Sequence, residues 1–228
     1  LLDWVNLPHA TSIWQLFHEK IIKRMGRKDN YFMFDLCDPS KKSGQEIDEV
    51  IDLISDFSLY GNVTLGLNEN ETNKIWMALT GRAETEVPSL EIAARFIYQA
   101  MNINTLLIHP VDRTLVVTNS MNPKAEPSSS KKTLQNPFVF EMKGNMVMTP
   151  KVLTGGGDNL NAGYCLGLLA GYEIEYCLLL GMAASGAYIQ NGNSPTIDEL
   201  IEYVERWAAS LNHSKISAYL DEPVRRIE

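Results

Sequence analysis

Three consecutive glycines, Gly155, Gly156 and Gly157, precede an aspartate, Asp158, and an apolar segment. Glycine has no Cβ atom, so the backbone can turn sharply here and several N–H groups can point at one spot. If a helix begins at this point, its N-terminus adds unpaired N–H donors and a partial positive charge. The stretch is therefore a candidate anion-binding cradle, in which Asp158 could accept a proton from an alcohol. The alternative is a structural glycine-rich loop in which Asp158 caps the helix.

Two common phosphate-binding motifs do not match this stretch. A dinucleotide-binding fingerprint that starts at Gly155 requires a glycine at the position of Leu160. A P-loop that starts at any of the three glycines requires its second glycine at position 160, 161 or 162, and then a Lys-Ser or Lys-Thr pair, and neither is present. The stretch therefore matches neither of these two phosphate-binding motifs.

Asn68 and Glu71 form a second candidate site. They follow residues 62–67, which have the pattern of a buried strand, and they open a predicted helix. In parallel α/β sheets, ligands bind at the carboxyl ends of strands. Residues three apart in the first turn of a helix can point to the same side. The alternative is a capping pair, with Asn68 as the N-cap and Glu71 reaching back to its backbone.

The segments around these motifs alternate between predicted helix and short buried strand, which is the pattern of a parallel α/β sheet. His109 directly follows one such strand, so it could face the site, and the alternative, which we favour, is a histidine satisfied by loop backbone. In the first predicted helix the apolar positions Ile13, Leu16, Phe17, Ile21 and Met25 follow the helical period, and His18 is expected to be solvated or half-buried. The further predicted strands are 31–36, 62–67, 105–108, 114–118, 138–140 and 146–148, the last predicted helix is capped by Thr196, and two apolar helices cover 162–170 and 176–189.

Composition excludes several classes of protein. The 228 residues carry a formal net charge of −8, which argues against a nucleic-acid binder or a binder of anionic membranes. No window is long and apolar enough for a membrane span, and no signal peptide is visible. Cys37, Cys165 and Cys177 are widely spaced, which predicts reduced thiols in a cytoplasmic protein rather than a disulfide framework or a zinc site.

The stretch V-L-T-G-G-G-D-N-L-N-A-G, residues 152–163, resembles the C-terminal motif of the ribokinase-like (PfkB) carbohydrate kinase family, which reads roughly D-T-x-G-A-G-D. The glycines and Asp158 align with that motif. Val152 stands where the first aspartate is usual, and Leu160 replaces the usual aromatic residue. Asn68 and Glu71 match the N-x-x-E motif of the same family, and they lie upstream of the cradle, as in the family.

This resemblance implies a ribokinase-like α/β fold, with a mostly parallel central sheet that has helices on both faces. It implies a kinase that uses ATP and Mg²⁺ to phosphorylate a hydroxyl of a sugar or sugar-like small molecule. Gly155, Gly156 and Gly157 would form the anion hole, Asp158 would be the base, and Asn68 and Glu71 would place the Mg²⁺. A monovalent cation requirement stays open. By the same resemblance we expect nucleotide contacts from Thr154, Asn161, Ala184, Ser185 and Asn191.

The resemblance covers the C-terminal two thirds of a family member, because the N-terminal part, the lid and the segment that grips the sugar are not recognisable. We therefore expect residues 1–228 to form a single ribokinase-like domain, as an N-terminally truncated fragment. The sugar cannot be named, and a homodimer stays open. One alternative is a non-catalytic nucleotide-binding or regulatory domain of the same fold. Another is an unrelated α/β domain in which the glycine loop is only structural.

Overall fold

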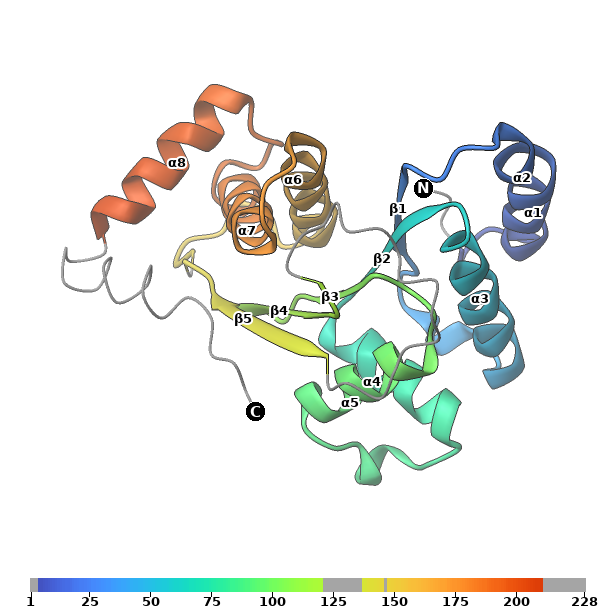
Figure 1. The fold of residues 1–228 in the computed structure, drawn as a ribbon. Helices are drawn as coiled ribbons and strands as arrows, with labels where there is room; N and C mark the ends of the chain where they lie inside the picture. Colours follow the sequence, from blue (N-terminus) through green and yellow to red (C-terminus); the bar gives the residue numbers. More distant parts are fainter. Residues whose placement is uncertain (1–3, 121–136, 146, 211–228) are drawn as a thin grey trace. The chain divides into compact units, whose positions relative to one another are not determined.

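The computed structural model describes residues 4–120, 137–145 and 147–210 (Figure 1). These residues divide into two compact units. The N-terminal unit contains residues 4–108, 116–120 and 137–138, and the C-terminal unit contains residues 109–115, 139–145 and 147–210. No helix in the described part of the chain is long and apolar enough to cross a membrane.

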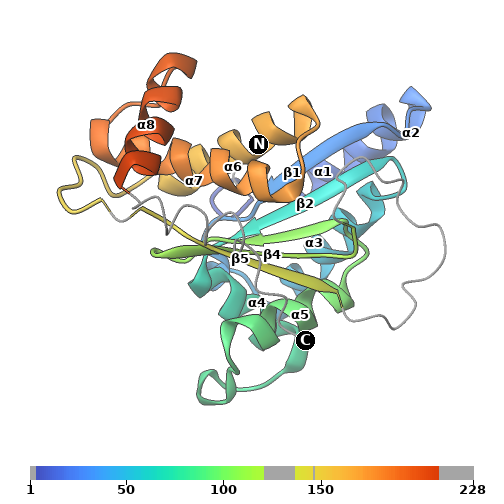
Figure 2. The ribbon, with the colours of Figure 1, turned by 60° about the vertical axis from the view of Figure 1, so that its left-hand side comes forward.

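Five strands form one sheet in the order β1-β2-β3-β4-β5 (Figure 2). The pairs β1–β2 and β2–β3 are parallel, with Asp35 opposite Gly66 and Leu67 opposite Ile108. This parallel register brings the carboxyl ends of the first three strands to the same edge, and it confirms the predicted α/β class. The strands are β1 (Asn30–Asp35), β2 (Gly61–Leu67), β3 (Thr105–Ile108), β4 (Arg113–Thr118) and β5 (Phe138–Lys143).

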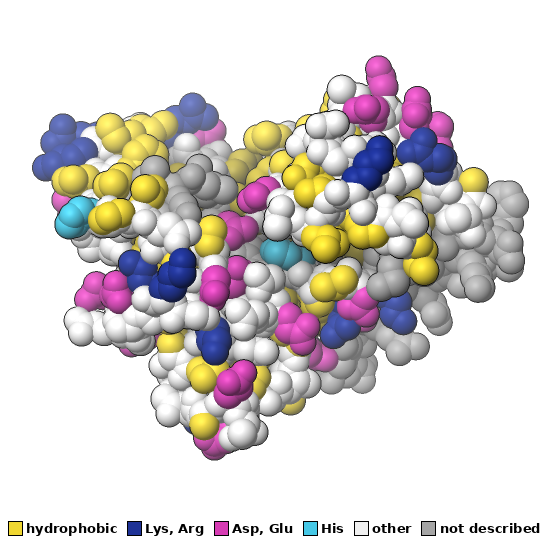
Figure 3. All heavy atoms as spheres, turned by 180° about the vertical axis from the view of Figure 1, so that it is seen from behind, with side chains coloured by type: hydrophobic (Ala, Val, Ile, Leu, Met, Phe, Trp, Pro, Cys, Tyr) yellow, Lys and Arg dark blue, Asp and Glu magenta, His cyan; other side chains and the backbone are white. Residues whose placement is uncertain are grey.

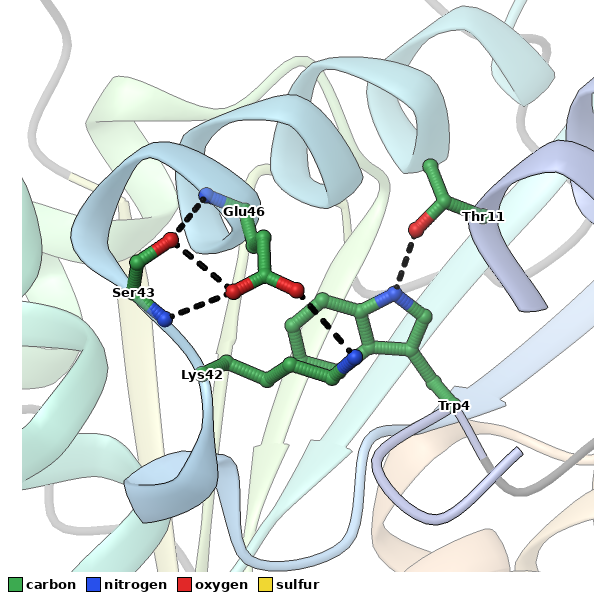
Figure 4. A network of polar contacts seen from close by, with 5 residues as sticks. All are labelled: Trp4, Thr11, Lys42, Ser43 and Glu46. Atoms are coloured by element: carbon green, nitrogen blue, oxygen red, sulfur yellow. Dashed lines mark hydrogen bonds and ion pairs between the residues drawn. The ribbon is translucent and has the colours of Figure 1, made fainter. Parts of the chain in front are cut away.

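Two α-helices of the N-terminal unit, α3 and α4, begin with capping boxes. At the start of α3, the backbone N–H of Ser43 donates to Glu46 Oε2 at 2.9 Å, and the N–H of Glu46 donates to Ser43 Oγ at 3.3 Å (Figure 4). Such a box satisfies two backbone donors that the helix leaves unpaired. The α-helices are α3 (Gly44–Phe57), α4 (Glu69–Thr80) and α5 (Leu90–Ala100), and short 3-10 turns cover Pro39–Lys41 and Glu84–Glu86.

The first helical segment differs from its prediction. It runs through α1 (Ala10–Phe17), a π-helical turn (His18–Ile22) and α2 (Lys23–Met25), and it buries Ala10, Trp14, His18 and Ile22. The predicted apolar positions are exposed instead, and hydrophobic side chains gather with Lys and Arg on this surface (Figure 3). Both faces of the segment carry apolar residues, so the helical period alone could not select the buried one. His18 is 3% exposed, and burial and the charge of Lys23 lower its pKa.

Two long helices, α6 and α7, pack side by side in the C-terminal unit (Figures 1 and 2). A Cβ atom on Gly163 would collide with the carbonyl oxygen of Leu180, and one on Gly181 would lie 2.8 Å from the carbonyl oxygen of Leu160. The small residues of this pair therefore allow the two backbones to approach closely. The helices are α6 (Gly156–Ala170), α7 (Ile174–Asn191) and α8 (Ile197–Ser210).

Two predictions about this unit need correction, and one is confirmed. Helix α6 begins six residues earlier than the predicted start at 162, so two of the cradle glycines belong to its first turn. Val147 and Met148 are not in a strand, and Met146 lies outside the described residues. Thr196 does cap α8, because its Oγ1 accepts from the N–H of Glu199 at 3.3 Å and its own N–H donates to Glu199 Oε2 at 2.7 Å.

Candidate functional site

The cradle is the N-terminal end of α6. Gly155 is the N-cap residue and has a left-handed conformation, with φ +84°, which glycine adopts without steric cost. Asp158 is the third residue of the helix, and it is exposed. The alternative in which Asp158 caps the helix is therefore wrong. The N–H groups of the first turn have no carbonyl acceptor within the helix, so they are available to an anion.

The first two glycines of the cradle are backed by side chains of α7. A Cβ atom on Gly155 would lie 2.8 Å from the hydroxyl oxygen of Tyr188. A Cβ atom on Gly156 would lie 3.1 Å from Cδ1 of Ile189 and 3.3 Å from Oγ of Ser185. A side chain at Gly155 would therefore have to displace Tyr188, and one at Gly156 would press on Ile189 and Ser185. The hydroxyl groups of Tyr188 and Ser185 lie beside the start of α6.

The third glycine is backed by a residue from the sheet. A Cβ atom on Gly157 would lie 2.9 Å from Cε1 of His109, which directly follows β3. The sequence offered two interpretations of His109, a residue that faces the site and one satisfied by loop backbone. The structure places its ring against the first turn of α6. Its position after a strand of a parallel sheet was the signal that could have identified it, because ligand sites gather at such strand ends.

The segment that leads into the cradle is tied to the end of α7. The backbone N–H of Lys151 donates to the carbonyl oxygen of Ile189 at 2.9 Å. After the turn, the side-chain amide of Asn159 donates to the carbonyl oxygen of Gly155 at 2.9 Å. Hydrogen bonds on both sides of the glycines therefore hold the loop in one conformation, and an anion could bind without a large loss of backbone entropy.

The residues predicted to contact a nucleotide have different positions. Ser185 contacts the cradle at Gly156, and Thr154 is exposed directly before it. Ala184 is 5% exposed and faces Gly163 of α6, so its small size serves helix packing. Asn161 is 4% exposed within α6, and Asn191 is the half-buried last residue of α7.

Asn68 and Glu71 lie in the N-terminal unit and form the capping pair that the sequence had offered as an alternative. The N–H of Asn68 donates to Glu71 Oε2, and the N–H of Glu71 donates to Asn68 Oδ1. Glu71 is 4% exposed, and its pKa is raised to about 7. Burial is the main cause, and the charges of Asp35 and Asp38 add to it, while the hydrogen bonds from Asn68 act in the opposite direction.

The same carboxylates determine whether a divalent cation would fit here. Asp35 ends β1, Glu71 lies in the helix after the neighbouring strand β2, and the charge of Asp35 disfavours ionisation of Glu71. A cation would remove that penalty. Within the described residues no group of three or more Asp, Glu, His or Cys side chains could hold a metal alone. The two acidic side chains are of a kind that Mg²⁺ accepts, because this ion is usually held by one or two carboxylates together with waters and substrate phosphates.

The chain is similar to known kinases. Residues 2–207 match the family model described as prokaryotic ketohexokinase. No curated protein sequence matches at a significant level. The structure is similar to ribokinase from Thermotoga maritima (17% identity, TM-score 0.55, covering 82% of this chain and 53% of that one). It is also similar to a phosphofructokinase-2 mutant from Escherichia coli (14% identity, TM-score 0.55, covering 86% of this chain and 62% of that one).

A third similar structure is ribokinase from Cryptococcus neoformans var. grubii in complex with ADP (16% identity, TM-score 0.50, covering 76% of this chain and 51% of that one). The chain thus spans about half the length of these ribokinases. At such identities the similarity shows the fold, which is ribokinase-like, as the cradle motif predicted. Because the family model matches most of the sequence, the chain belongs to the prokaryotic ketohexokinase family.

Proposed function

We propose that this chain carries the phosphate-binding and catalytic part of a sugar kinase, which transfers the γ-phosphate of ATP to a hydroxyl of a carbohydrate or a related small molecule. The observation that carries the proposal is the exposed Asp158 in the first turn of α6, beside N–H donors that a glycine backbone leaves accessible. This arrangement combines a group that accepts a proton with donors for a phosphate.

The cradle and Asp158 supply two requirements of phosphoryl transfer. Negative charge on the transferring phosphoryl group is stabilised by preorganised N–H donors, here those of Gly156, Gly157 and Asp158. Asp158 accepts the proton of the attacking hydroxyl, as the new P–O bond to the acceptor forms and the bond to the ADP leaving group breaks. The helix N-terminus adds a partial positive charge in the same place.

Asn68 and Glu71 would hold the Mg²⁺ that accompanies the nucleotide, largely through bound waters. When it is bound, Mg²⁺ neutralises charge on the phosphates. The contribution of the chain is a carboxylate that is costly to ionise without a cation, because Glu71 is buried near Asp35 and Asp38. Ser185, beside Gly156, is the best placed of the five residues expected to contact the nucleotide.

A ketohexose is the acceptor to test first, because the matching family model is described as ketohexokinase. The experiment measures ADP binding by calorimetry, and ADP release from Mg²⁺-ATP with a panel of ketohexoses, aldoses and sugar acids. ADP release that requires both an acceptor and Asp158 would support the proposal. ADP binding without turnover for any acceptor would favour the non-catalytic nucleotide-binding alternative. Failure to bind ADP would contradict both.

A further inference from the structure

His109 and Gly157 are in direct contact in the C-terminal unit. The imidazole fills the space that a side chain at position 157 would need, since an added Cβ would lie 2.9 Å from Cε1, 3.5 Å from Nε2 and 3.7 Å from Nδ1. All three ring atoms thus lie within 3.7 Å of that Cβ position. Real Cβ atoms essentially never approach another heavy atom as closely as 2.9 Å, so this ring and a side chain at 157 cannot occupy the same space.

The direction of this contact is informative. Cα–Cβ bonds in a helix tilt toward its N-terminus, so a group in the Cβ position of Gly157 flanks the N-terminal side of the first turn. That side is the one where the unpaired N–H groups of α6 converge. The imidazole of His109 therefore lies beside the turn that the proposed function assigns to the phosphate, rather than against the middle of the helix.

The histidine is half-buried, and its Nε2 is shielded from solvent. The first turn of α6 therefore contacts a ring that the protein partly encloses. Asp158 is the next residue after Gly157, so a change in the position of Gly157 would be transmitted directly to the carboxylate that accepts the proton.

We infer that His109 is a positioning residue of the kinase site, which supports Gly157 and thereby fixes the first turn of α6 and Asp158 for phosphate binding and proton transfer. This inference rests on the proposed function and adds a residue to it. His109 acts through the turn, so its replacement should change ligand binding at temperatures where the chain is still folded.

The experiment is a double-mutant cycle on Gly157 and His109 of this chain, and ADP is the ligand whose affinity is measured. Gly157→Ala introduces a methyl group into the space that the imidazole occupies, and His109→Ala vacates that space. We expect Gly157→Ala to weaken ADP binding by about tenfold, and we expect the double variant to bind ADP more tightly than Gly157→Ala alone. Gly44→Ala is the matched control, because Gly44 also lies in the first turn of a helix and a Cβ there meets nothing within 4 Å.

Two further measurements keep the outcome unambiguous. Thermal unfolding of each variant shows whether binding was measured on folded protein. Amide hydrogen exchange of Asn159, whose N–H donates to the carbonyl oxygen of Gly155 at 3.2 Å, reports the first turn without any ligand, and it should accelerate in His109→Ala. Losses of ADP affinity that simply add in the double variant, or unchanged exchange in His109→Ala, would overturn the inference. If the unchanged chain did not bind ADP although exchange accelerated in His109→Ala, the proposed nucleotide function would fail while the contact itself was verified.

Discussion

The backbone N–H of Asn68 donates to Oε2 of Glu71 at 2.8 Å, and the backbone N–H of Glu71 donates to Oδ1 of Asn68 at 2.9 Å. This reciprocal pair starts α4 and holds the carboxyl group of Glu71 in a buried position. The hydrogen bonds favour the ionised carboxylate, but burial outweighs them and raises its pKa to about 7. The Glu71 side chain thus completes the capping box of α4, while burial raises its own pKa to about 7.

The stability of the chain should therefore depend on pH through Glu71. Its pKa rises from 4.5 to about 7 on folding, so the folded state binds more protons than the unfolded state between these values. Stability from this group is fully present below pH 4.5 and is lost as pH rises through about 7. The loss is at most about 3 kcal/mol.

Urea unfolding at pH 5 and pH 8 measures this effect. Glu71→Gln keeps an acceptor for the N–H of Asn68 but cannot ionise. The difference in unfolding free energy between the variant and the original chain should therefore favour the variant more at pH 8 than at pH 5. Glu69→Gln, an exposed residue of the same helix, is the control and should leave the difference unchanged. An equal pH dependence in Glu71→Gln and the original chain would show that Glu71 is not the titrating group.

Binding of Mg²⁺-ADP near pH 7 should release protons from Glu71. A cation near the carboxylate favours its ionised form and lowers its pKa, so the proton that a half-titrated Glu71 carries is displaced. Calorimetry in two buffers of different ionisation enthalpy measures the protons released. ADP in the presence of EDTA, and Mg²⁺-ADP with Glu71→Gln, should release fewer. Equal release with and without Mg²⁺ would argue against a cation beside Glu71.

Asp158→Ala should lower turnover by about 10² to 10⁴-fold, because general base catalysis typically contributes that factor. ADP binding should change much less, since the N–H donors of the cradle belong to the backbone. Asp198→Ala is a matched control, because Asp198 is an acidic residue in the first turn of α8. Turnover that is unchanged in Asp158→Ala would remove Asp158 from the base role.

Gly163→Ala should destabilise the chain by about 1–3 kcal/mol, the usual cost of overpacking a close contact. The added Cβ would collide with the backbone carbonyl of Leu180, which cannot rotate away as a side chain could. The helices α6 and α7 would have to separate. Urea unfolding of Gly163→Ala and of the control Gly44→Ala tests this, and equal stability of the two variants would show that α6 and α7 can yield at this contact.

Gly155→Ala should weaken ADP binding, and removing the side chain of Tyr188 as well should not restore that binding. Alanine at φ +84° is strained by about 1–2 kcal/mol, and its Cβ would also lie 2.8 Å from the hydroxyl of Tyr188. Adding Tyr188→Ala removes the contact but leaves the strain. ADP titration of the single and double variants separates the two causes, and full recovery in the double variant would mean that the left-handed backbone of Gly155 is not required.

Much of the fold was available from local sequence patterns. The four residues of β3 and the cap at Thr196 were predicted correctly, because continuous burial and capping chemistry are local properties. The cradle glycines and Asp158 were also recognisable, since a turn with several accessible N–H groups needs glycine wherever it occurs. The start of α6 was placed too late, because a glycine-rich first turn has low intrinsic helix propensity and is held by tertiary contacts.

The buried face of the first helix and the contact between His109 and Gly157 depended on tertiary packing. The first helix has apolar residues on both faces, and only packing selected Trp14 and Ile22 rather than Leu16 and Phe17 for burial. Likewise, the sequence determined that Gly157 lacks a side chain. The tertiary structure decided that the ring of His109, which lies 48 positions earlier in the chain, fills that space. Local sequence patterns report which secondary structure a segment prefers. Contacts between distant segments exist only after the strands and helices have packed.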